Sequence, residues 1–336
     1  MRTTVVISII NYRTKDLTIA SAQSALRDLA GINGEVVIVD NRSEDGSADA
    51  IEAWITGLPQ DSPVRLIRSA TNSGFSGGHN QIIAATDAEF YLILNSDATL
   101  EPGFLTTILN VAAAAPEAGI FAPHVESENG QPEHTFFRFP SPVSEFIRGA
   151  NTQLVTRLFG AWDVPLGLDP APEKIDWVSF PCVLVRAEMV RDIGPMDEGY
   201  FLYFEDTEYC LRAGRASWGI VRAPEARAVH LKGQSGPVNA FQTARKRLPS
   251  YYYSSRTRFL YQAHGLIGVW AANILWTLGR GIAGTRRLLG RRRDNLKAGE
   301  ARDIWTNIRT PLEANYAPVP GFSEGRTPDP KSGPVP

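Results

Sequence analysis

The chain has 336 residues and a formal net charge of −2, and its composition of 43% hydrophobic and 21% charged residues is typical of a globular enzyme. This near-neutral charge argues against a nucleic-acid-binding protein. The charge is uneven, because the stretch from Arg245 to Arg302 holds thirteen Lys and Arg but only two Asp and Glu. Cys182 and Cys210 lie in apolar surroundings without ligand spacing, so we expect reduced, buried thiols.

Apolar runs rich in Val and Ile alternate with helical patterns along the first 120 residues. We expect strands at Val5–Ile10, Glu35–Asp40, Val64–Arg68 and Phe90–Leu94, helices at Leu17–Leu29, Ser47–Trp54 and Gly77–Ala85, and later strands at Val183–Arg186 and Gly219–Arg222. Continuous rather than alternating hydrophobicity indicates strands that are covered on both faces. The sequence therefore predicts an α/β fold with a mostly parallel sheet flanked by helices.

Polar residues follow each of the first four predicted strands at its carboxyl end. They are Asn11 and Tyr12, then Asp40, Asn41 and Ser43, then Asn72 and Gly74, and finally Asn95, Ser96 and Asp97. Ligands of open α/β sheets bind beyond these ends. Any one of these residues fits a helix cap or a turn, but their repetition at one edge predicts a binding site. No Gly-rich turn follows the first strand, which weighs against a nicotinamide dehydrogenase.

Three carboxylates, Glu205, Asp206 and Glu208, directly follow the aromatic stretch 200–204. Desolvation and like charge both raise the pKa of a carboxyl group, toward the range in which it works as a base. The ordinary alternative is the first turn of a helix, where acids favour the helix dipole. Arg212 lies one helical turn after Glu208, so we expect these two side chains to pair.

Six motifs occur along the chain in a fixed order. They are Asn11-Tyr12, Val39-Asp40-Asn41-x-Ser43, Asn72-x-Gly74-Phe75-x-Gly77-Gly78-x-Asn80, Leu94-Asn95-Ser96-Asp97, Phe204-Glu205-Asp206 and His230-x-x-Gly233-x-Ser235. In this order they resemble the motifs of family 2 glycosyltransferases, and the chain is similar to the rhamnosyltransferase-type branch over about residues 4–262. The resemblance implies an inverting transferase with the GT-A fold.

The resemblance implies a role for each matching residue. The donor-binding residues would be Asn11, Asp40, Asn41, Asn72, Gly74, Asn80 and Asp97, with Asp40 on the nucleoside of a nucleotide sugar. Asp97 takes the last position of the family's Asp-x-Asp motif and, with His230, would hold a divalent cation, Mn²⁺ or Mg²⁺, on the diphosphate. Asn95 takes the first position, which removes one negative charge from the site.

Asp206 matches the catalytic base of the family. Direct displacement at an anomeric carbon requires one base to take the proton of the acceptor hydroxyl. Glu205, Glu208 and Trp177 would support the site or bind the acceptor. Phe180-Pro181 stands where relatives carry small residues, so the loop beside the donor sugar would be bulkier and would alter sugar selectivity.

The resemblance favours transfer of L-rhamnose from dTDP-rhamnose to a hydroxyl of a cell-surface or exported glycan, which can be lipid-linked. Two alternatives stay open: a family 2 transferase with another donor, such as a UDP-sugar, and a catalytically silent scaffold that binds nucleotide sugars. A sugar nucleotidyltransferase is disfavoured, because the segment after the first strand is not a Gly-rich basic loop.

Aromatic and apolar residues alternate with arginines from Tyr251 to Arg293. This pattern is typical of helices that lie in the headgroup region of an anionic membrane, and the alternative is helices packed on the catalytic domain with arginines in solvent. The longest apolar stretch, Leu266–Leu278, is shorter than the roughly 18–20 residues of a membrane-spanning helix. No export signal is visible, so we expect a cytoplasmic protein, peripheral on the inner face of the cytoplasmic membrane.

We expect three regions along the chain. Residues 1–244 would form the GT-A catalytic domain, with a nucleotide-sugar half at about 1–120 and an acceptor and base half at about 121–244. Residues 245–309 would form a basic amphipathic helical extension, and residues 310–336, rich in Pro, Gly and Ser, a disordered tail. The expected partners are a nucleotide-sugar donor, a glycan or lipid-linked glycan acceptor and an anionic membrane surface, with no nucleic acid.

Overall fold

The computed structural model describes residues 2–231, 246–288, 290 and 297–313. A mixed eight-stranded sheet forms its centre, with the strand order β3-β2-β1-β4-β9-β6-β10-β5. The strands are β1 (Thr3–Asn11), β2 (Gly34–Asp40), β3 (Val64–Arg68), β4 (Ala88–Asn95), β5 (Ala98–Leu100), β6 (Ala118–Ser127), β9 (Cys182–Arg186) and β10 (Gly219–His230). Neighbouring strands are parallel except where β9 or β5 takes part.

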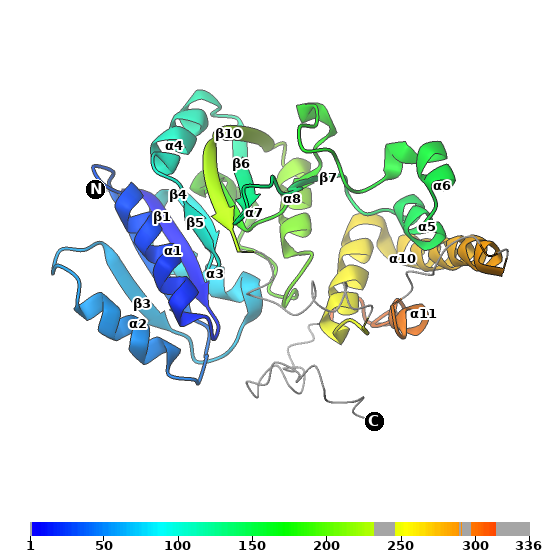
Figure 1. Ribbon diagram of the computed structural model, residues 1–336, viewed down its shortest axis with the longest axis horizontal. Coiled ribbons are helices and arrows are strands. Elements are labelled where there is room, and N and C mark those ends of the chain that lie inside the picture. The colour runs from blue at the N-terminus through cyan, green and yellow to red at the C-terminus, as the bar shows by residue number, and fades with distance from the viewer. Residues whose placement is uncertain (1, 232–245, 289, 291–296, 314–336) are drawn as a thin grey trace.

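Helices cover both faces of the sheet (Figure 1). The helices are α1 (Lys15–Asp28), α2 (Ser47–Thr56) and α4 (Phe104–Ala114) on one face, and α3 (Gly74–Ala84), α7 (Ala187–Ile193) and α8 (Glu205–Arg215) on the other. Successive residues of β1 alternate between the two faces: Val5 packs in the first hydrophobic cluster and Val6 in the second. This arrangement explains why the strands are continuously apolar, and it confirms the predicted α/β class.

The elements expected from the sequence are present, and all but β10 lie within a few residues of their predicted bounds. Helix α3 starts at Gly74 rather than Gly77, and β10 continues to His230. The sequence did not reveal that β9 runs antiparallel to β4 and β6. Cys182 and Cys210 are buried free thiols, as expected.

A second region lies beside the sheet and is mainly helical. It contains β7 (Phe136–Phe137) paired with β8 (Trp177–Val178), α5 (Pro142–Ala150), α6 (Gln153–Leu158), two short 3-10 helices (Gly160–Trp162 and Pro172–Lys174), α10 (Ser250–Leu288) and α11 (Glu300–Asp303). Helix α10 is kinked at Gly265, whose φ of 68° and ψ of −175° lie in a region that favours glycine. Two helical halves, 250–264 and 266–288, therefore meet at this residue.

Helices α5 and α10 approach each other backbone to backbone. A Cβ on Gly149 would lie 2.3 Å from the carbonyl oxygen of Trp276, and a Cβ on Gly279 would lie 2.5 Å from that of Phe146. Only residues without a side chain permit this separation. The glycine pair thus fixes the second half of α10 against α5.

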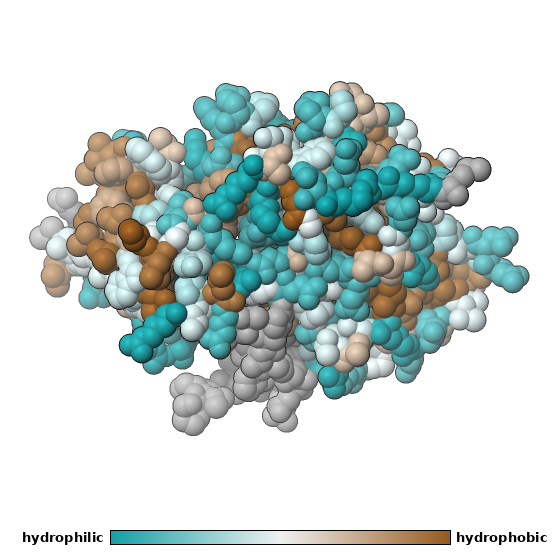
Figure 2. Space-filling view, turned by 180° about the vertical axis from the view of Figure 1, so that it is seen from behind, coloured by the Kyte–Doolittle hydropathy of each residue, from teal (hydrophilic) through white to brown (hydrophobic). Residues whose placement is uncertain are grey.

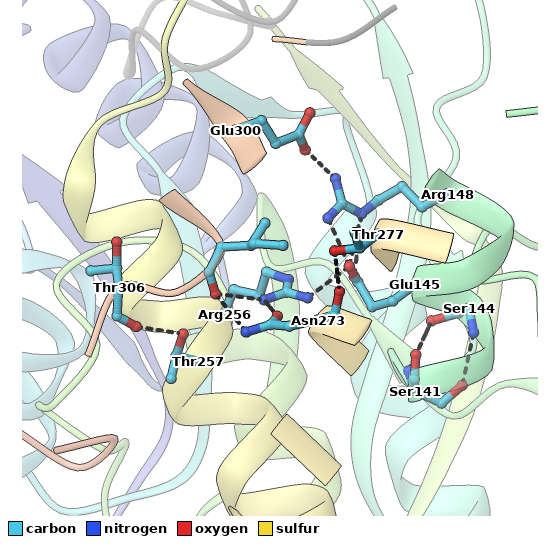
Figure 3. A network of polar contacts seen from close by, with 11 residues as sticks. Ser141, Ser144, Glu145, Arg148, Arg256, Thr257, Asn273, Thr277, Glu300 and Thr306 are labelled. Atoms are coloured by element: carbon cyan, nitrogen blue, oxygen red, sulfur yellow. Dashed lines mark hydrogen bonds and ion pairs between the residues drawn. The ribbon is translucent and has the colours of Figure 1, made fainter. Parts of the chain in front are cut away.

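A buried charge network joins α5, α10 and α11 (Figure 3). Arg256, 2% exposed, donates to Glu145 at 2.7 Å and to Asn273 at 2.9 Å. Glu145 also accepts from Arg148 at 2.7 Å, and Arg148 pairs with Glu300. Arg256 therefore lies neither at a lipid headgroup nor in solvent, unlike both expectations for the arginines of this region.

Among the described helices, α10 alone is long and apolar enough to cross a membrane by length and composition. Its first half is instead packed inside the protein, with Tyr251, Tyr253, Phe259 and Leu260 buried. The expectation of a lipid-facing surface along the whole stretch is therefore wrong for residues 250–264. Residues 314–336 of the expected tail, and the motif residues Gly233 and Ser235, lie outside the described residues.

Candidate active site

The carboxyl ends of β1, β2 and β4 lie side by side at one edge of the sheet. In the strand register Asn11 is opposite Asp40, and Ile10 is opposite Asn95. The amide of Asn11 donates to Asp40 at 2.6 Å and to Ser43 at 3.0 Å, and the hydroxyl of Ser43 donates to Asp40 at 2.6 Å. The structure thus brings these predicted strand-end residues together in one buried hydrogen-bonded group.

Asn41 ties the end of β2 to the Gly-rich segment. Its amide donates to Asn72 Oδ1 at 3.0 Å and to the carbonyl of Gly74 at 2.9 Å. Gly74 has a φ of 69°, and a Cβ there would lie 2.1 Å from the carbonyl oxygen of Phe201. The backbone N–H of Phe75 donates to the same oxygen at 2.9 Å. The Gly-rich segment therefore lies against the aromatic stretch that precedes Asp206.

Asn80 lies on the same helix but contacts another loop. Its amide nitrogen donates to the carbonyl of Met196 at 2.9 Å and to Glu198 at 2.9 Å, and its oxygen accepts from the N–H of Met196 at 3.0 Å. Both donors of the amide are used in these contacts. Its side chain therefore links α3 to the loop that leads to Asp206.

Asp97 and His230 meet through the pairing of β5 with β10, which sets His230 opposite Ala98. His230 Nε2 lies 3.4 Å from Asp97 Oδ1, and Nδ1 lies 3.2 Å from Glu133 Oε2. Burial alone would lower the pKa of His230, but the carboxylates of Asp97 and Glu133 outweigh it and raise that pKa to about 9. Glu133 lies outside every sequence motif, so only the folded chain reveals its contact with His230.

The side chains at this point suit a divalent cation. Asp97 is buried, and within the described part of the chain its carboxylate has His230, at 3.4 Å, as an ion-pair partner but makes no hydrogen bond of good geometry. A buried carboxylate without donors is costly unless a cation or another partner compensates it. Asp97 offers a hard oxygen ligand, the type that suits Mn²⁺ or Mg²⁺, and His230 would add an imidazole nitrogen in its neutral form.

The protein supplies only part of such a site. Within the described ranges, no group of three His, Cys, Asp or Glu side chains is placed to enclose a metal ion. Mg²⁺ is commonly bound by one or two carboxylates, with substrate phosphates and water in the remaining positions. The two side chains therefore fit a cation that is shared with a diphosphate.

Glu205 and Asp206 begin α8 directly after a strained turn. Tyr203 and Phe204 have φ values of 72° and 70°, a conformation that bulky residues rarely adopt. Tyr203 stacks on Tyr251 with ring centroids 6.3 Å apart, and Phe204 lies 5.9 Å from Phe259. The first half of α10 thus holds the turn that presents the acid pair.

The two neighbouring carboxyl groups affect each other's ionisation. Desolvation raises the pKa of Asp206 to about 6, although hydrogen bonds from Thr207 and from the backbone of Phe180 oppose this rise. Burial, together with the charge of Asp206, raises the pKa of Glu205 well above its ordinary value. Near neutral pH Asp206 is therefore an anion able to accept a proton, and the proton of the pair is held more tightly by Glu205.

The loop after β8 bridges the acid pair and the end of β4. The backbone of Phe180 lies near enough to the carboxylate of Asp206 to lower its pKa slightly, and the carbonyl of Pro181 accepts from the N–H of Asn95 at 2.9 Å. The bulky Phe180-Pro181 pair thus lies between Asp206 and the Asn95–Asp97 segment. Trp177, earlier in this segment, stacks on Phe137 at 4.3 Å between ring centroids.

Ion pairs stabilise α8 and the loop that leads to it. Glu208 accepts two hydrogen bonds from Arg212, at 2.6 and 3.0 Å, which confirms the predicted pair. Asp197 accepts two from Arg258 of α10, at 2.9 and 2.8 Å. The contact between Asp197 and Arg258 was missed, because the two residues are 61 positions apart and neither belongs to a motif.

A mostly parallel sheet with helices on both faces, and a cluster of acids and a histidine at its carboxyl edge, define a GT-A fold. Residues 4–158 match the family described as Glycosyl transferase family 2. Over this part of the chain, which is a little under half of it, the sequence is similar to that family, as its motifs indicated. An N-acetylglucosaminyl-diphospho-decaprenol L-rhamnosyltransferase of Mycobacterium tuberculosis is 28% identical over 289 residues, which cover 80% of this chain and 89% of the relative.

Solved structures establish the same fold. The mannosyltransferase PcManGT from Pyrobaculum calidifontis, in complex with GDP-Man and Mn²⁺, has a TM-score of 0.52 and 13% identity, covering 93% of this chain and 85% of that one. GalNAc-T7 with UDP, GalNAc and Mn²⁺ has a TM-score of 0.58 and 10% identity, covering 92% of this chain and 55% of that one.

Proposed function

We propose that this glycosyltransferase works by a single, inverting displacement in which Asp206 is the base. The observation that carries the proposal is the acid pair, in which desolvation raises the pKa of Asp206 to about 6 while burial and the charge of Asp206 raise the pKa of Glu205 well above its ordinary value. A base is most effective when its pKa lies near the working pH. Asp206 would take the proton of the acceptor hydroxyl as that oxygen attacks the anomeric carbon.

The donor would bind at the carboxyl edge of the sheet. Asp97 and His230 would hold a divalent cation, which when bound offsets the charge of the departing diphosphate. The nucleoside would lie against Asp40, Asn41, Asn72 and Gly74. Asn11 would hold Asp40 in place, and Asn80 would hold the loop at Met196.

We propose L-rhamnose from dTDP-rhamnose as the donor and a lipid-linked glycan as the acceptor, at the inner face of the cytoplasmic membrane. The mycobacterial relative, whose name specifies both L-rhamnose and a decaprenol-linked acceptor, supports this assignment. A UDP-sugar donor is the alternative, because Phe180-Pro181 reshapes the loop beside the site. A silent scaffold is a second candidate, which the uncharged Asn95 in the metal-binding motif favours.

The test is to compare Asp206→Asn with wild type for transfer and for donor binding. We expect turnover to fall by a factor of about 10² or more, with the donor dissociation constant unchanged, because Asn cannot accept the proton. Glu205→Gln is the matched control: an amide resembles a protonated carboxyl, so turnover should largely survive. If Asp206→Asn keeps wild-type turnover, Asp206 is not the base.

Screening wild type against dTDP- and UDP-sugars separates the remaining candidates. Transfer from dTDP-rhamnose supports the proposed donor, and transfer from a UDP-sugar alone supports the alternative. Tight donor binding by wild type without transfer to any glycan or lipid-linked acceptor would favour the scaffold.

A further inference from the structure

The second half of α10 has two opposite faces. Its buried face, which includes Val269, Ala272, Trp276 and Gly279, packs on the protein. Its exposed face carries five large apolar side chains, Leu266, Ile267, Trp270, Ile274 and Leu278, with exposed fractions from 47% to 86%. At 100° per residue they fall within an arc of roughly 120°. We call these five residues the apolar stripe.

The apolar surface continues onto a neighbouring element. Leu154 and Leu158 of α6 are 68% and 69% exposed, and α6 is joined to α10 through a small cluster that includes Val155 and Ile282. Figure 2 shows apolar side chains gathered at this end of the molecule, on the left in that view. Single exposed apolar residues are common, but a row of them beside a second group marks an interaction surface.

The charge around the stripe indicates what it contacts. Helix α10 contains no Asp or Glu, whereas Arg280, Arg286 and Arg287 follow the stripe. Anionic lipid headgroups complement this charge. A second copy of the chain, paired stripe to stripe, would bring arginines toward arginines if the helices were parallel, and would offer them no acid from the partner's α10 if the helices were antiparallel. The surface therefore fits an anionic bilayer better than a copy of itself.

The packing of α10 against the protein limits how deeply the helix can enter a bilayer. Gly279 contacts the backbone of α5, and Asn273 takes part in the buried network of Arg256 and Glu145. Insertion across a bilayer would break these contacts and expose the charged side chains to hydrocarbon. A helix that is held on one face and apolar on the other lies in the plane of the interface.

We propose that residues 266–288 of α10 dock on an anionic lipid bilayer through the apolar stripe, with the arginines among the headgroups. The first half of the same helix holds the turn at Tyr203 and Phe204 and, through Arg258, the loop at Asp197. Docking therefore sets the acid pair at a fixed position relative to the membrane. The lipid-linked acceptor is part of the proposed function. For such an acceptor, docking places the reacting hydroxyl within reach of Asp206.

The test is co-sedimentation of the full chain with phosphatidylcholine vesicles that contain or lack phosphatidylglycerol. Wild type should bind the anionic vesicles, and binding should weaken as salt rises. The double variant Ile267→Asn, Trp270→Ser should lower the partition coefficient by about tenfold or more, because two apolar side chains no longer leave water. Leu168→Asn, at an exposed apolar position outside the stripe, is the matched control and should bind as wild type.

Equal sedimentation of wild type and the double variant, with unchanged melting temperatures, would overturn the proposal. So would a wild-type dimer in analytical ultracentrifugation that the double variant dissociates while neither protein binds vesicles, because the stripe would then join two copies. Transfer to a soluble acceptor should be the same in wild type and the double variant. Loss of vesicle binding with intact transfer therefore tests the docking surface separately from the catalytic assignment.

Discussion

Removing the charge of Glu145 should destabilise the protein strongly, because this side chain neutralises two arginines at once. Glu145→Gln keeps the shape of the side chain but leaves Arg148 and Arg256 without their shared carboxylate. The side chain of Arg148 is 37% exposed and can turn toward water, whereas that of Arg256 is 3% exposed and cannot. The cost therefore falls mainly on Arg256, as an uncompensated buried charge.

The size of the effect follows from the ionisation of Glu145. Burial alone would raise its pKa, but Arg148 and Arg256 outweigh burial and lower the pKa to about 2 from an ordinary value of 4.5. Each unit corresponds to about 1.4 kcal/mol, so the charged form contributes about 3 kcal/mol to stability. Breaking a buried pair by removing one partner typically costs 3–5 kcal/mol, which agrees with this value.

Urea unfolding of wild type and Glu145→Gln at pH 7 measures the difference. Since folding lowers the pKa of Glu145, its contribution is fully present above pH 4.5 and is lost as the pH falls toward 2. The difference between the two proteins should shrink over that range. Glu52→Gln, which breaks an exposed pair with Arg68, is the control and should have no measurable effect. A loss below about 0.5 kcal/mol for Glu145→Gln would refute the assigned role of the network.

Three further predictions concern the site and its support. Asp97→Ala should abolish the stabilisation of donor binding by Mn²⁺, measured by calorimetry with and without the metal, and unchanged metal dependence would remove Asp97 from the metal site. His79 is buried and its pKa is lowered to about 3 by desolvation, so folding favours its neutral form and stability should fall as the pH drops below 6.5, by about 2 kcal/mol at pH 5. His79→Gln should flatten this slope in urea titrations, and an equal slope in both proteins would contradict the assignment. Gly74→Ala should lower the melting temperature more than Gly46→Ala, because both have positive φ but only Gly74 meets a backbone oxygen; equal losses would mean that the contact with Phe201 is unimportant.

The sheet could be predicted because its signal is local. Each strand is a continuous apolar run, and each strand end is marked by polar residues that parallel pairing brings to one edge. This reasoning placed Asp40 and Asp97 at the carboxyl edge of the sheet from the sequence alone. It could not reveal the antiparallel direction of β9, because an apolar run such as Cys182–Arg186 reads the same in either direction.

The contacts that support the site were harder to predict, because they join residues that are distant in sequence. Taken singly, none of these residues indicates its partner. Glu133 contacts His230 across 97 positions, and Arg258 contacts Asp197 across 61. From the sequence, an arginine in an apolar helix is expected to face solvent or lipid headgroups. Only the folded structure shows that a carboxylate neutralises Arg256 in the protein interior. Asn80 is the last residue of a motif, yet its amide contacts a loop more than a hundred residues further along the chain.

Helix α10 packs against the turn that precedes Asp206, although the sequence indicated a C-terminal extension separate from the catalytic domain. A non-glycine residue at positive φ is held only when its surroundings over-determine it, and at Tyr203 and Phe204 those surroundings are the aromatic side chains of α10. The kink at Gly265 changes the direction of the helix. Residues 250–264, which pack around the turn at Tyr203 and Phe204, are therefore followed by residues of the exposed apolar stripe. A chain that ended before α10 would keep the sheet and the strand-end residues but lose the contacts that fix Asp206. Residues 250–264 are therefore structurally part of the proposed active site, although none of the sequence motifs lies among them.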